Sequence, residues 1–543
     1  MLALHLFSLL LAASLVNGLT SLTASNTSEP SIVDLGYAKY RGVRLAAGVD
    51  QYLGMRYAAP PLGDLRFRGP KDPLKEEGIQ NATQFRPICM GSAQSPSASI
   101  GEDCLFVNVF TPSGATPTSK LPVWLYFQGG GYRANANNNY NGTKVVEESG
   151  KKIVYVNFNY RVGPLGFLAS EEVRRNGDLN AGLLDQRRVL HWVKKNISKF
   201  GGNPKYVVIH GASAGASSVV HHLTAYGGRN DALFVGAAIQ SLFCSPLRTV
   251  AEVKFQFDRF VKDIGCSGAK DKLACLRSAK LKSFLAASKV YPLPGSASNL
   301  PLPNWYWLPV IDGNMIRQSL YGQFQQGKFI KVPMLIGSAN DEGTMYAPNA
   351  SNTTDITLFF KNNFPGLDQK GLQDILTAYP LLPALRRHAK WFPSAAAAYG
   401  DVTFTCPGNQ LAIYQAFNFS SSKVWNYRFN VLDPDNEAAG LGVVHTQDAS
   451  AILGVGHARS YPRSYTTTNA AIVPITMHYY ISFIRSLNPN KYRLAGAPLW
   501  EPWGSGSGVR LRIQTNDTGM ESIPTQQTQQ CNLWKRLSGQ MRI

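Results

Sequence analysis

The apolar positions of this chain gather in short runs that end abruptly in glycine or polar residues. Four such runs predict strands: Leu121–Phe127, Tyr206–His210, Val332–Gly337 and Val424–Phe429. Short β-branched and aromatic runs of this kind are typical of buried strands. Active sites of open α/β sheets collect at the ends of such strands. The residues that follow the runs are therefore the first candidates for chemistry.

The run Tyr206–His210 breaks into Gly211-Ala212-Ser213-Ala214-Gly215, and helix-compatible residues follow. G-x-S-x-G between a strand and a helix is the pattern of a nucleophile elbow, which holds a serine on a sharp, strained turn. Small residues on either side of Ser213 let the two backbones approach closely. The N–H of Ala214 would then lie at a helix N-terminus and could donate to an oxyanion. A tight strand–helix connection without chemistry has the same pattern, so the motif alone leaves catalysis open.

A glycine-rich segment upstream favours the catalytic interpretation. The run Leu121–Phe127 continues into Gln128 and then three consecutive glycines, Gly129 to Gly131. Each glycine weakens a strand or helix by roughly 0.5–1 kcal/mol relative to alanine, so three together do not serve strand stability. They suit a loop whose amides approach a ligand closely, as an oxyanion loop does, and a flexible turn is the alternative.

A serine nucleophile needs a base and a carboxylate that orients the base. Among the nine histidines of the chain, His445 lies in a glycine-rich loop after the run Val424–Phe429. Glu342 follows the run Val332–Gly337. The order Ser213, Glu342, His445 is the order found in the fold that carries the nucleophile elbow. Helix-capping or ion-pair roles would give the same local pattern for Glu342 and His445.

Further segments resemble the type-B carboxylesterase family, which includes the cholinesterases and some fungal lipases. They run in family order from near Leu35 to the C-terminus, so the resemblance covers nearly the whole chain. It implies an α/β-hydrolase fold, with a mostly parallel central sheet flanked by helices and with large loop and helical insertions. The matching segments are Leu53–Ala58, Pro60–Gly63, Arg66–Phe67, Glu102–Leu105, Asn159–Gly163, Gly182–Gln186, Phe200–Pro204, Gly211–Gly215, Asp341–Gly343 and the His445 loop.

The resemblance also implies roles for individual residues. Ser213 is the nucleophile, Glu342 the acid and His445 the base, and no cofactor or metal takes part. The remaining implied residues are the oxyanion-hole N–H groups of Gly130, Gly131 and Ala214, and the structural ion pairs Arg66 with Glu102 and Arg161 with Asp185.

Two positions depart from the family pattern. Ala212 stands where a glutamate usually precedes the nucleophile, which puts rate and substrate preference in doubt, and Gln128 stands where a histidine is frequent.

Residues 1–18 have the pattern of a secretory signal peptide, with an apolar core and small residues suited to cleavage at its end. The apolar stretch is shorter than the ~20 residues that a membrane span needs, and no later segment qualifies. We therefore expect a secreted chain.

With 44% hydrophobic and 16% charged residues and no internal repeat, residues 19–543 fit one large α/β-hydrolase domain better than several small ones.

Cysteines and sequons fit the same compartment. The seven cysteines cannot all pair, and spacing alone does not choose a connectivity. The family resemblance implies Cys89–Cys104, Cys266–Cys275 and Cys406–Cys531, which leaves Cys244 free. No cysteine or histidine cluster has metal-ligand spacing. Candidate glycosylation sites are the N-x-S/T asparagines Asn26, Asn81, Asn141, Asn196, Asn349, Asn352, Asn418 and Asn516, not all of which we expect to be used.

The net charge of +20 is unusually high. The basic residues occur as scattered pairs without a long run or interleaved aromatics, so we expect no nucleic-acid partner. A basic exterior would attract acidic polymers or anionic substrates weakly. Solubility in an acidic medium explains the same charge, and we favour it.

The segment between Cys89 and Cys104 bears on the substrate, because lipases of the family have an amphipathic lid there and cholinesterases a tryptophan. Here residues 90–103 are rich in serine and glycine and contain no aromatic residue. The sequence thus predicts a secreted serine carboxylic-ester hydrolase, acting through an acyl-enzyme on soluble esters with short or medium acyl chains. A lipase with an apolar flap around Ser283–Asn304 is the alternative. A non-catalytic adhesion protein of the same fold is a remote one, since the triad is present.

Overall fold

The computed structural model describes residues 29–136, 139–458, 460–504 and 508–543. The predicted signal peptide, residues 1–18, and the sequon at Asn26 lie outside the described residues. Within the described ranges, no helix combines the length and the apolar character that crossing a membrane requires.

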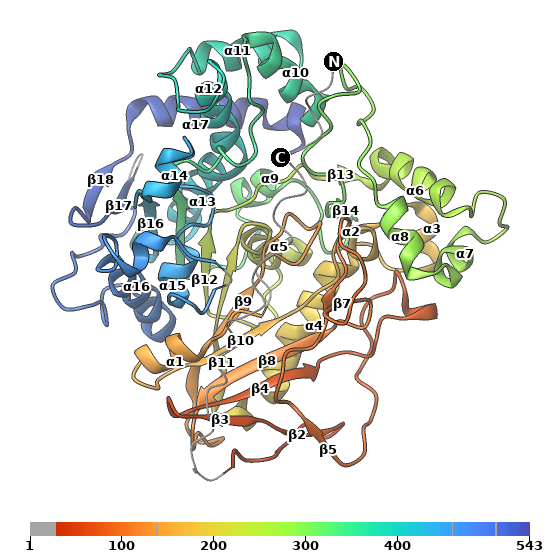
Figure 1. The fold of residues 1–543 in the computed structure, drawn as a ribbon, viewed down its shortest axis with the longest axis vertical. Coiled ribbons are helices and arrows are strands. Elements are labelled where there is room, and N and C mark those ends of the chain that lie inside the picture. The colour runs from red at the N-terminus through yellow and green to blue at the C-terminus, as the bar shows by residue number, and fades with distance from the viewer. Residues whose placement is uncertain (1–28, 137–138, 459, 505–507) are drawn as a thin grey trace.

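One eleven-stranded sheet organises the chain, in the order β18-β17-β16-β15-β12-β11-β9-β10-β8-β4-β3. The strands from β10 through β9, β11, β12, β15 and β16 to β17 are parallel, and the outer pairs at both edges are antiparallel. Figure 1 shows the early strands at one end of the sheet and the late strands at the other. The sheet strands are β3 (Val43–Leu45), β4 (Val49–Arg56), β8 (Phe106–Pro112), β9 (Leu121–Phe127), β10 (Val154–Phe158), β11 (Gly202–Ala212), β12 (Gly236–Gln240), β15 (Met334–Ala339), β16 (Val424–Phe429), β17 (Val509–Ile513) and β18 (Gly519–Ser522).

The four predicted strands are all present. β9 and β16 have the expected bounds, and β11 is longer than expected at both ends. β15 begins one residue after Pro333, which has no N–H to donate to a neighbouring strand. The α/β-hydrolase fold class inferred from the family resemblance is therefore correct.

Short strands and helices complete the fold. The short strands are β1 (Val33–Asp34), β2 (Lys39–Arg41), β5 (Ile79–Asn81), β6 (Ile88–Cys89), β7 (Ile100–Gly101), β13 (Arg248–Thr249) and β14 (Val310–Ile311). The α-helices are α1 (Thr143–Glu148), α2 (Gly163–Phe167), α3 (Glu171–Asn176), α4 (Ala181–Asn196), α5 (Ala214–Gly228), α6 (Val250–Ile264), α7 (Lys272–Ser278), α8 (Leu281–Ala287), α9 (Leu320–Gln325), α10 (Thr353–Asn363), α11 (Gln369–Ala378), α12 (Phe392–Gly400), α13 (Cys406–Gln415), α14 (Pro434–Ala438), α15 (Ala449–Leu453), α16 (Ile472–Ser486) and α17 (Thr525–Met541).

The buried apolar residues form clusters on both faces of the sheet. One cluster joins the sheet to α4, α5, α13 and α17. A second joins it to α1, α15 and α16. A third holds α6, α7 and α8 together beside the sheet, where they form the green group in Figure 1. Both faces of the parallel strands are therefore covered, which explains why the central strands β9, β10, β12 and β15 are mostly apolar and buried.

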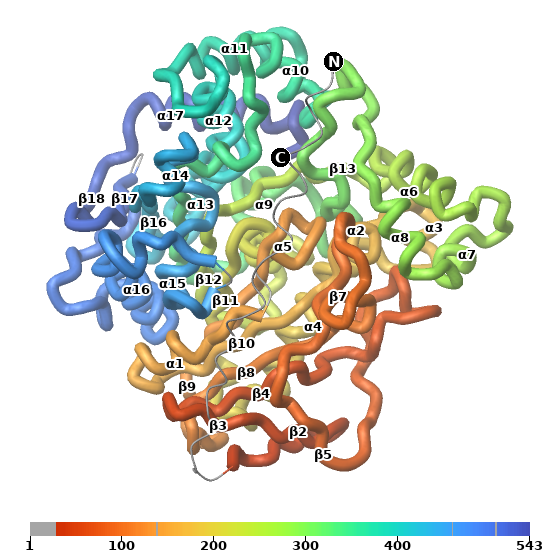
Figure 2. Tube along the Cα trace, in the orientation of Figure 1, coloured from red at the N-terminus to blue at the C-terminus, as the bar shows by residue number. Residues whose placement is uncertain are grey.

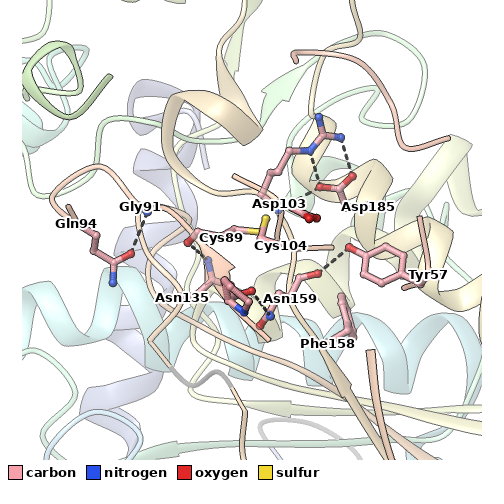
Figure 3. The surroundings of a disulfide bond; sticks show 12 residues. Tyr57, Cys89, Gly91, Gln94, Asp103, Cys104, Asn135, Phe158, Asn159 and Asp185 are labelled. Carbon is pink, nitrogen blue, oxygen red and sulfur yellow. Dashed lines mark hydrogen bonds and ion pairs between the residues drawn. A yellow bond between two sulfur atoms is a disulfide. The ribbon is translucent and has the colours of Figure 1, made fainter. Parts of the chain in front are cut away.

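Three disulfides cross-link the described residues, and one of them joins segments that are distant in sequence. The structure forms the disulfides Cys89–Cys104, Cys266–Cys275 and Cys406–Cys531, and Cys244 is a buried free thiol. Cys406–Cys531 ties α13 to the C-terminal helix α17, which packs beside α11 (Figure 2). The surroundings of Cys89–Cys104 are drawn in Figure 3.

Both ion pairs that the resemblance implied are formed and buried. Arg66 is bidentate to Glu102 and also donates to the carbonyl oxygen of Arg277 at 2.9 Å. Arg161 Nε and Nη2 donate to the two carboxylate oxygens of Asp185 at 2.8 and 2.7 Å. The Arg66–Glu102 pair connects two loops, and the Arg161–Asp185 pair connects a loop to α4.

Candidate active site

Ser213 occupies a strained turn between β11 and α5. Its backbone has φ +58° and ψ −125°, a region that residues with a side chain rarely adopt. The N–H of Ser213 donates to the carbonyl oxygen of Gln240 at the end of β12, 3.0 Å away. Its own carbonyl accepts from the Ser217 N–H at 3.0 Å, which begins the helix. The turn predicted from G-x-S-x-G is thus present, with Ser213 8% exposed.

The two glycines of the motif permit this turn. A Cβ on Gly211 would lie 2.2 Å from the carbonyl oxygen of Gly215. A Cβ on Gly215 would lie 2.0 Å from the carbonyl oxygen of Phe127, the last residue of β9. The first turn of α5 therefore packs directly against the start of the loop that contains Gly129, Gly130 and Gly131, hereafter the glycine loop. This contact places Gln128, which precedes the three glycines, beside the first turn of α5.

Glu342 and His445 are brought together from loops 103 residues apart. Their carboxylate and imidazole Nδ1 are hydrogen-bonded directly, and both side chains are buried. The second oxygen of Glu342 accepts from the Ala339 N–H at 2.7 Å. His445 Nε2 is buried and has no hydrogen-bond partner among the described residues, Ser213 included. The imidazole is thus oriented from one side, while the nitrogen that would act as a base is left unoccupied.

A neighbouring carboxylate joins the two loops. Asp341 accepts from the Val443 N–H at 2.8 Å and donates its own N–H to the Val443 carbonyl at 2.9 Å. Thr344 Oγ1 donates to the Leu441 carbonyl at 2.8 Å. Burial raises the pKa of Asp341 above its usual range. These bonds fix the His445 loop against the Glu342 turn.

A buried polar network lies behind the nucleophile. Asp448, three residues after His445, accepts hydrogen bonds from Gln240 Nε2 and from the Tyr427 hydroxyl. Gln240 also bonds His210 of β11 at 3.2 Å. Burial raises the pKa of Asp448 to about 6 and lowers that of His210 to about 3. Since the Gln240 carbonyl holds the Ser213 N–H, this network links the nucleophile turn to the helix that follows His445.

Aromatic side chains pack against His445 and against the glycine loop. The Phe404 ring centroid lies 4.3 Å from that of His445, and the Tyr346 ring meets the imidazole edge-on at 5.4 Å. The Trp305 ring is tilted by 57° against that of Phe243, and the two ring centroids are 4.7 Å apart. A Cβ on Gly131 would lie 2.1 Å from the Trp305 ring, so the indole lies directly against the glycine loop.

The indole is held in place and leaves little space behind it. Trp305 Nε1 donates to the Tyr399 hydroxyl at 2.8 Å. A cavity of about 10 Å³ remains between Trp305, Phe243, Cys244 and Tyr399. Burial raises the pKa of the Cys244 thiol to about 12, so this cysteine lines the cavity as a neutral, unreactive thiol.

The predicted sequons differ in exposure. Asn196 is 2% exposed, and its Nδ2 donates to the Trp192 carbonyl at 3.1 Å, so the folded chain offers no room for a glycan there. The other described sequons are exposed or partly exposed: Asn81, Asn141, Asn349, Asn352, Asn418 and Asn516.

In the part of the chain that the structure describes, no group of three or more histidine, cysteine or acidic side chains could hold a metal ion.

The sequence did not reveal two features of the site. One is the group of aromatic side chains formed by Phe404, Tyr346, Trp305 and Phe243, here called the aromatic wall, and the other is the buried polar network around Asp448. The run Asn304-Trp305-Tyr306-Trp307 was a usable signal for the wall, because three adjacent aromatics are uncommon outside a core or a binding site. Asp448 and Gln240 had no such signal, since nothing local marks them as partners.

Comparison with known proteins shows the family to which the chain belongs. The model of the carboxylesterase family matches residues 29–534. The crystal structure of Aspergillus niger EstA superimposes with a TM-score of 0.93 at 54% identity, and the match covers 95% of this chain and 99% of that one. Lipase 2 of Geotrichum candidum is 31% identical over 88% of this chain and 90% of its own length. Secreted lipase 1 of Botryotinia fuckeliana (strain B05.10) is 32% identical, covering 85% of each.

Proposed function

The chain belongs to the carboxylesterase family and is a carboxylic ester hydrolase, and we propose that it cleaves soluble short- to medium-chain esters through an acyl-enzyme on Ser213. The observation that carries the mechanism is the Glu342–His445 pair, whose Nε2 is unoccupied, in a site that also contains a serine on a strained turn. In structures without substrate, catalytic hydrogen bonds are frequently long and tighten only in the reacting complex.

The proposed reaction has two halves. His445 Nε2 takes the proton of Ser213 Oγ as the oxygen attacks the ester carbonyl, and then gives it to the leaving alcohol. Glu342 holds the imidazole in one orientation and stabilises its charged form. The N–H groups of Gly130, Gly131 and Ala214 stabilise the oxyanion. Water then repeats the sequence on the acyl-enzyme and releases the acid.

Two observations support the preference for short or medium acyl chains. Between Cys89, where β6 ends, and Cys104 the chain forms only the short strand β7, so this loop presents no amphipathic helix to a lipid surface. Trp305 closes the space beside Phe243 and leaves a cavity of only about 10 Å³ behind it. Long acyl chains would have to displace the indole.

A lipase on longer-chain acylglycerols is the second candidate. Leu300 and Leu302 are 68% and 37% exposed, and both lie in the segment Ser283–Asn304 where the sequence allowed an apolar flap. Met345, three residues after Glu342, is 55% exposed. Relatives at about a third identity are named lipases. These exposed side chains would suit contact with a lipid surface.

We also propose that the protein is secreted and glycosylated at exposed sequons. Relatives from Botryotinia fuckeliana and Gibberella zeae are named secreted lipases. The three disulfides suit an oxidising compartment. Peptide mapping before and after deglycosylation should find glycans at exposed positions such as Asn349 and Asn352, and none at Asn196.

Replacement of the nucleophile tests the mechanism. Ser213→Ala should lower kcat on a p-nitrophenyl short-chain ester by at least about 10⁴-fold, because the remaining groups cannot form the acyl-enzyme. Ser217→Ala is the matched control, since this serine lies one turn further along α5 and its hydroxyl is buried without a partner among the described residues. Near wild-type turnover by the Ser213 variant would disprove the assignment.

A panel of esters of rising acyl length tests the substrate preference. The wild type should be fastest on short or medium chains and should show no jump in rate when the substrate passes its solubility limit. Trp305→Ala should shift the optimum to longer chains because it opens the closed end of the site, whereas Trp305→Phe should shift it less. Best activity on emulsified long-chain triglycerides would establish the lipase alternative.

A further inference from the structure

The glycine loop is clamped by the loop that the Cys89–Cys104 disulfide closes. The Ser92 N–H donates to the Arg133 carbonyl at 2.8 Å. A Cβ on Gly91 would lie 2.5 Å from the same oxygen, so the two backbones are in direct contact. The disulfide loop therefore packs along the segment that follows Gly131.

A buried asparagine forms the centre of this contact. Asn135 is 1% exposed, and its Nδ2 donates to the Cys89 carbonyl oxygen at 3.0 Å (Figure 3). Its Oδ1 accepts from Gln128 Nε2, on the residue that precedes the three glycines. Asn135 thus connects both ends of the glycine loop to the disulfide.

Gln128 extends the connection into the sheet. It is also 1% exposed, and its Nε2 lies 3.2 Å from the Phe158 carbonyl and 3.2 Å from Asn159 Oδ1, at the end of β10. The Gln128 carbonyl accepts from the Tyr160 hydroxyl at 2.9 Å. Removing one partner from such a buried set leaves the others unsatisfied, which costs more than the bond itself contributes.

The two glycines proposed as oxyanion donors are held by this arrangement. Gly130 and Gly131 have φ of +118° and +60°. The Ala134 N–H donates to the Gly130 carbonyl at 3.1 Å, and a Cβ on Gly130 would lie 2.0 Å from the Ala134 carbonyl oxygen. Ala134 immediately precedes Asn135. A shift of Asn135 therefore moves the turn that carries the N–H groups of Gly130 and Gly131.

We propose that Asn135 is a positioning residue, which aligns the oxyanion N–H groups of Gly130 and Gly131 by anchoring their loop to the Cys89 carbonyl. This inference rests on the proposed role of these glycines. Oxyanion donors act only within about 2.7–3.1 Å of the charged oxygen, and a displacement of about 1 Å can cost ~100-fold in rate. Asn135 touches no reacting atom, and its effect appears only in transition-state binding.

Asn135→Ala tests the proposal. We expect kcat per titrated active site to fall about 10–100-fold with KM within about twofold, because ground-state binding does not use the oxyanion donors. The inhibition constant of an alkyl trifluoromethyl ketone, which forms an anionic tetrahedral adduct with a catalytic serine, should rise by the same factor. Gln94→Ala is the matched control: this amide lies in the same disulfide loop and accepts from Gly91 N–H at 2.9 Å within it. It should retain wild-type values.

A second variant keeps the test decisive if Asn135→Ala fails to fold. Asn135→Asp retains the shape and the acceptor for Gln128, but donates to the Cys89 carbonyl only when protonated. Its kcat relative to wild type should therefore recover as the pH falls below about 5. A wild-type kcat in folded Asn135→Ala, or a loss in Asn135→Asp that does not vary with pH, would overturn the inference. Ser213→Ala separates the two hypotheses, because its inactivity would uphold the proposed mechanism even then.

Discussion

At the scale of single residues, the placement of one buried carboxylate has a consequence for stability. Asp448 is fully buried and is held by Gln240 and Tyr427, with no cation bonded to it among the described residues. Burial raises its pKa from 3.8 to about 6. The folded state therefore binds a proton more tightly than the unfolded chain, and this group loses favourable free energy for folding as the pH rises from about 4 to about 6.

Asp448→Asn should remove that dependence. An amide keeps the size of the side chain and one acceptor oxygen but carries no charge, so any packing cost is the same at every pH. The melting temperature of the variant relative to wild type should therefore be higher at pH 7 than at pH 4. Thermal unfolding of both proteins at the two pH values measures this, and an equal difference at both would show that Asp448 does not titrate in this interval.

At the scale of elements, one substitution is expected to have opposite effects in two helices. Gly215 lies in the first turn of α5, where a Cβ would meet a backbone oxygen of β9 at 2.0 Å. Gly539 lies in the last turns of α17, where a Cβ would meet nothing within 4 Å. Helix propensity favours alanine at both positions, so only the contact of Gly215 with the end of β9 distinguishes them.

Gly539→Ala should increase the free energy of unfolding by about 0.5–1 kcal/mol, because alanine loses less backbone entropy on folding. Gly215→Ala should lower it by about 3 kcal/mol or more, since neither backbone can move away easily, and should also impair turnover. Denaturant titrations of the two variants provide the comparison. A Gly215 variant as stable as wild type would contradict the close approach of α5 and β9.

At the scale of the whole molecule, the C-terminal helix is secured to the core by one covalent bond. Cys406–Cys531 closes a loop with a sequence separation of 125, whereas Cys266–Cys275 closes one of 9. In the chain-entropy model the stabilisation grows with the logarithm of loop length. The two bridges should therefore contribute unequally.

Replacing Cys406 and Cys531 together by serine should lower the free energy of unfolding by about 4–5 kcal/mol, and replacing Cys266 and Cys275 by about 2–3 kcal/mol. Urea titrations of the two double variants give both values under identical conditions. If the short loop proved the more stabilising one, native-state contacts of α7 would outweigh unfolded-state entropy.

The sequence by itself determined the features that contiguous residues encode. The runs at Leu121–Phe127 and Val424–Phe429 specified strands through apolar side chains that can be buried on both faces. Gly211 and Gly215 specified the sharp turn at Ser213, because only small residues allow it. Glu342 and His445 were selected by their positions after strands and by family resemblance. Local sterics and periodicity are properties of the chain itself, so they can be read without a fold.

Only the tertiary structure decided which distant groups meet. Gln240 and Asp448 are 208 residues apart, and their hydrogen bond exists because the sheet order places the end of β12 beside the His445 loop. Trp305 lies against Gly131 because the long segment between β12 and β15 returns to the glycine loop. Asn135 reaches the Cys89 carbonyl for a similar reason. Such contacts depend on the relative placement of packed elements, which no local pattern of residues encodes.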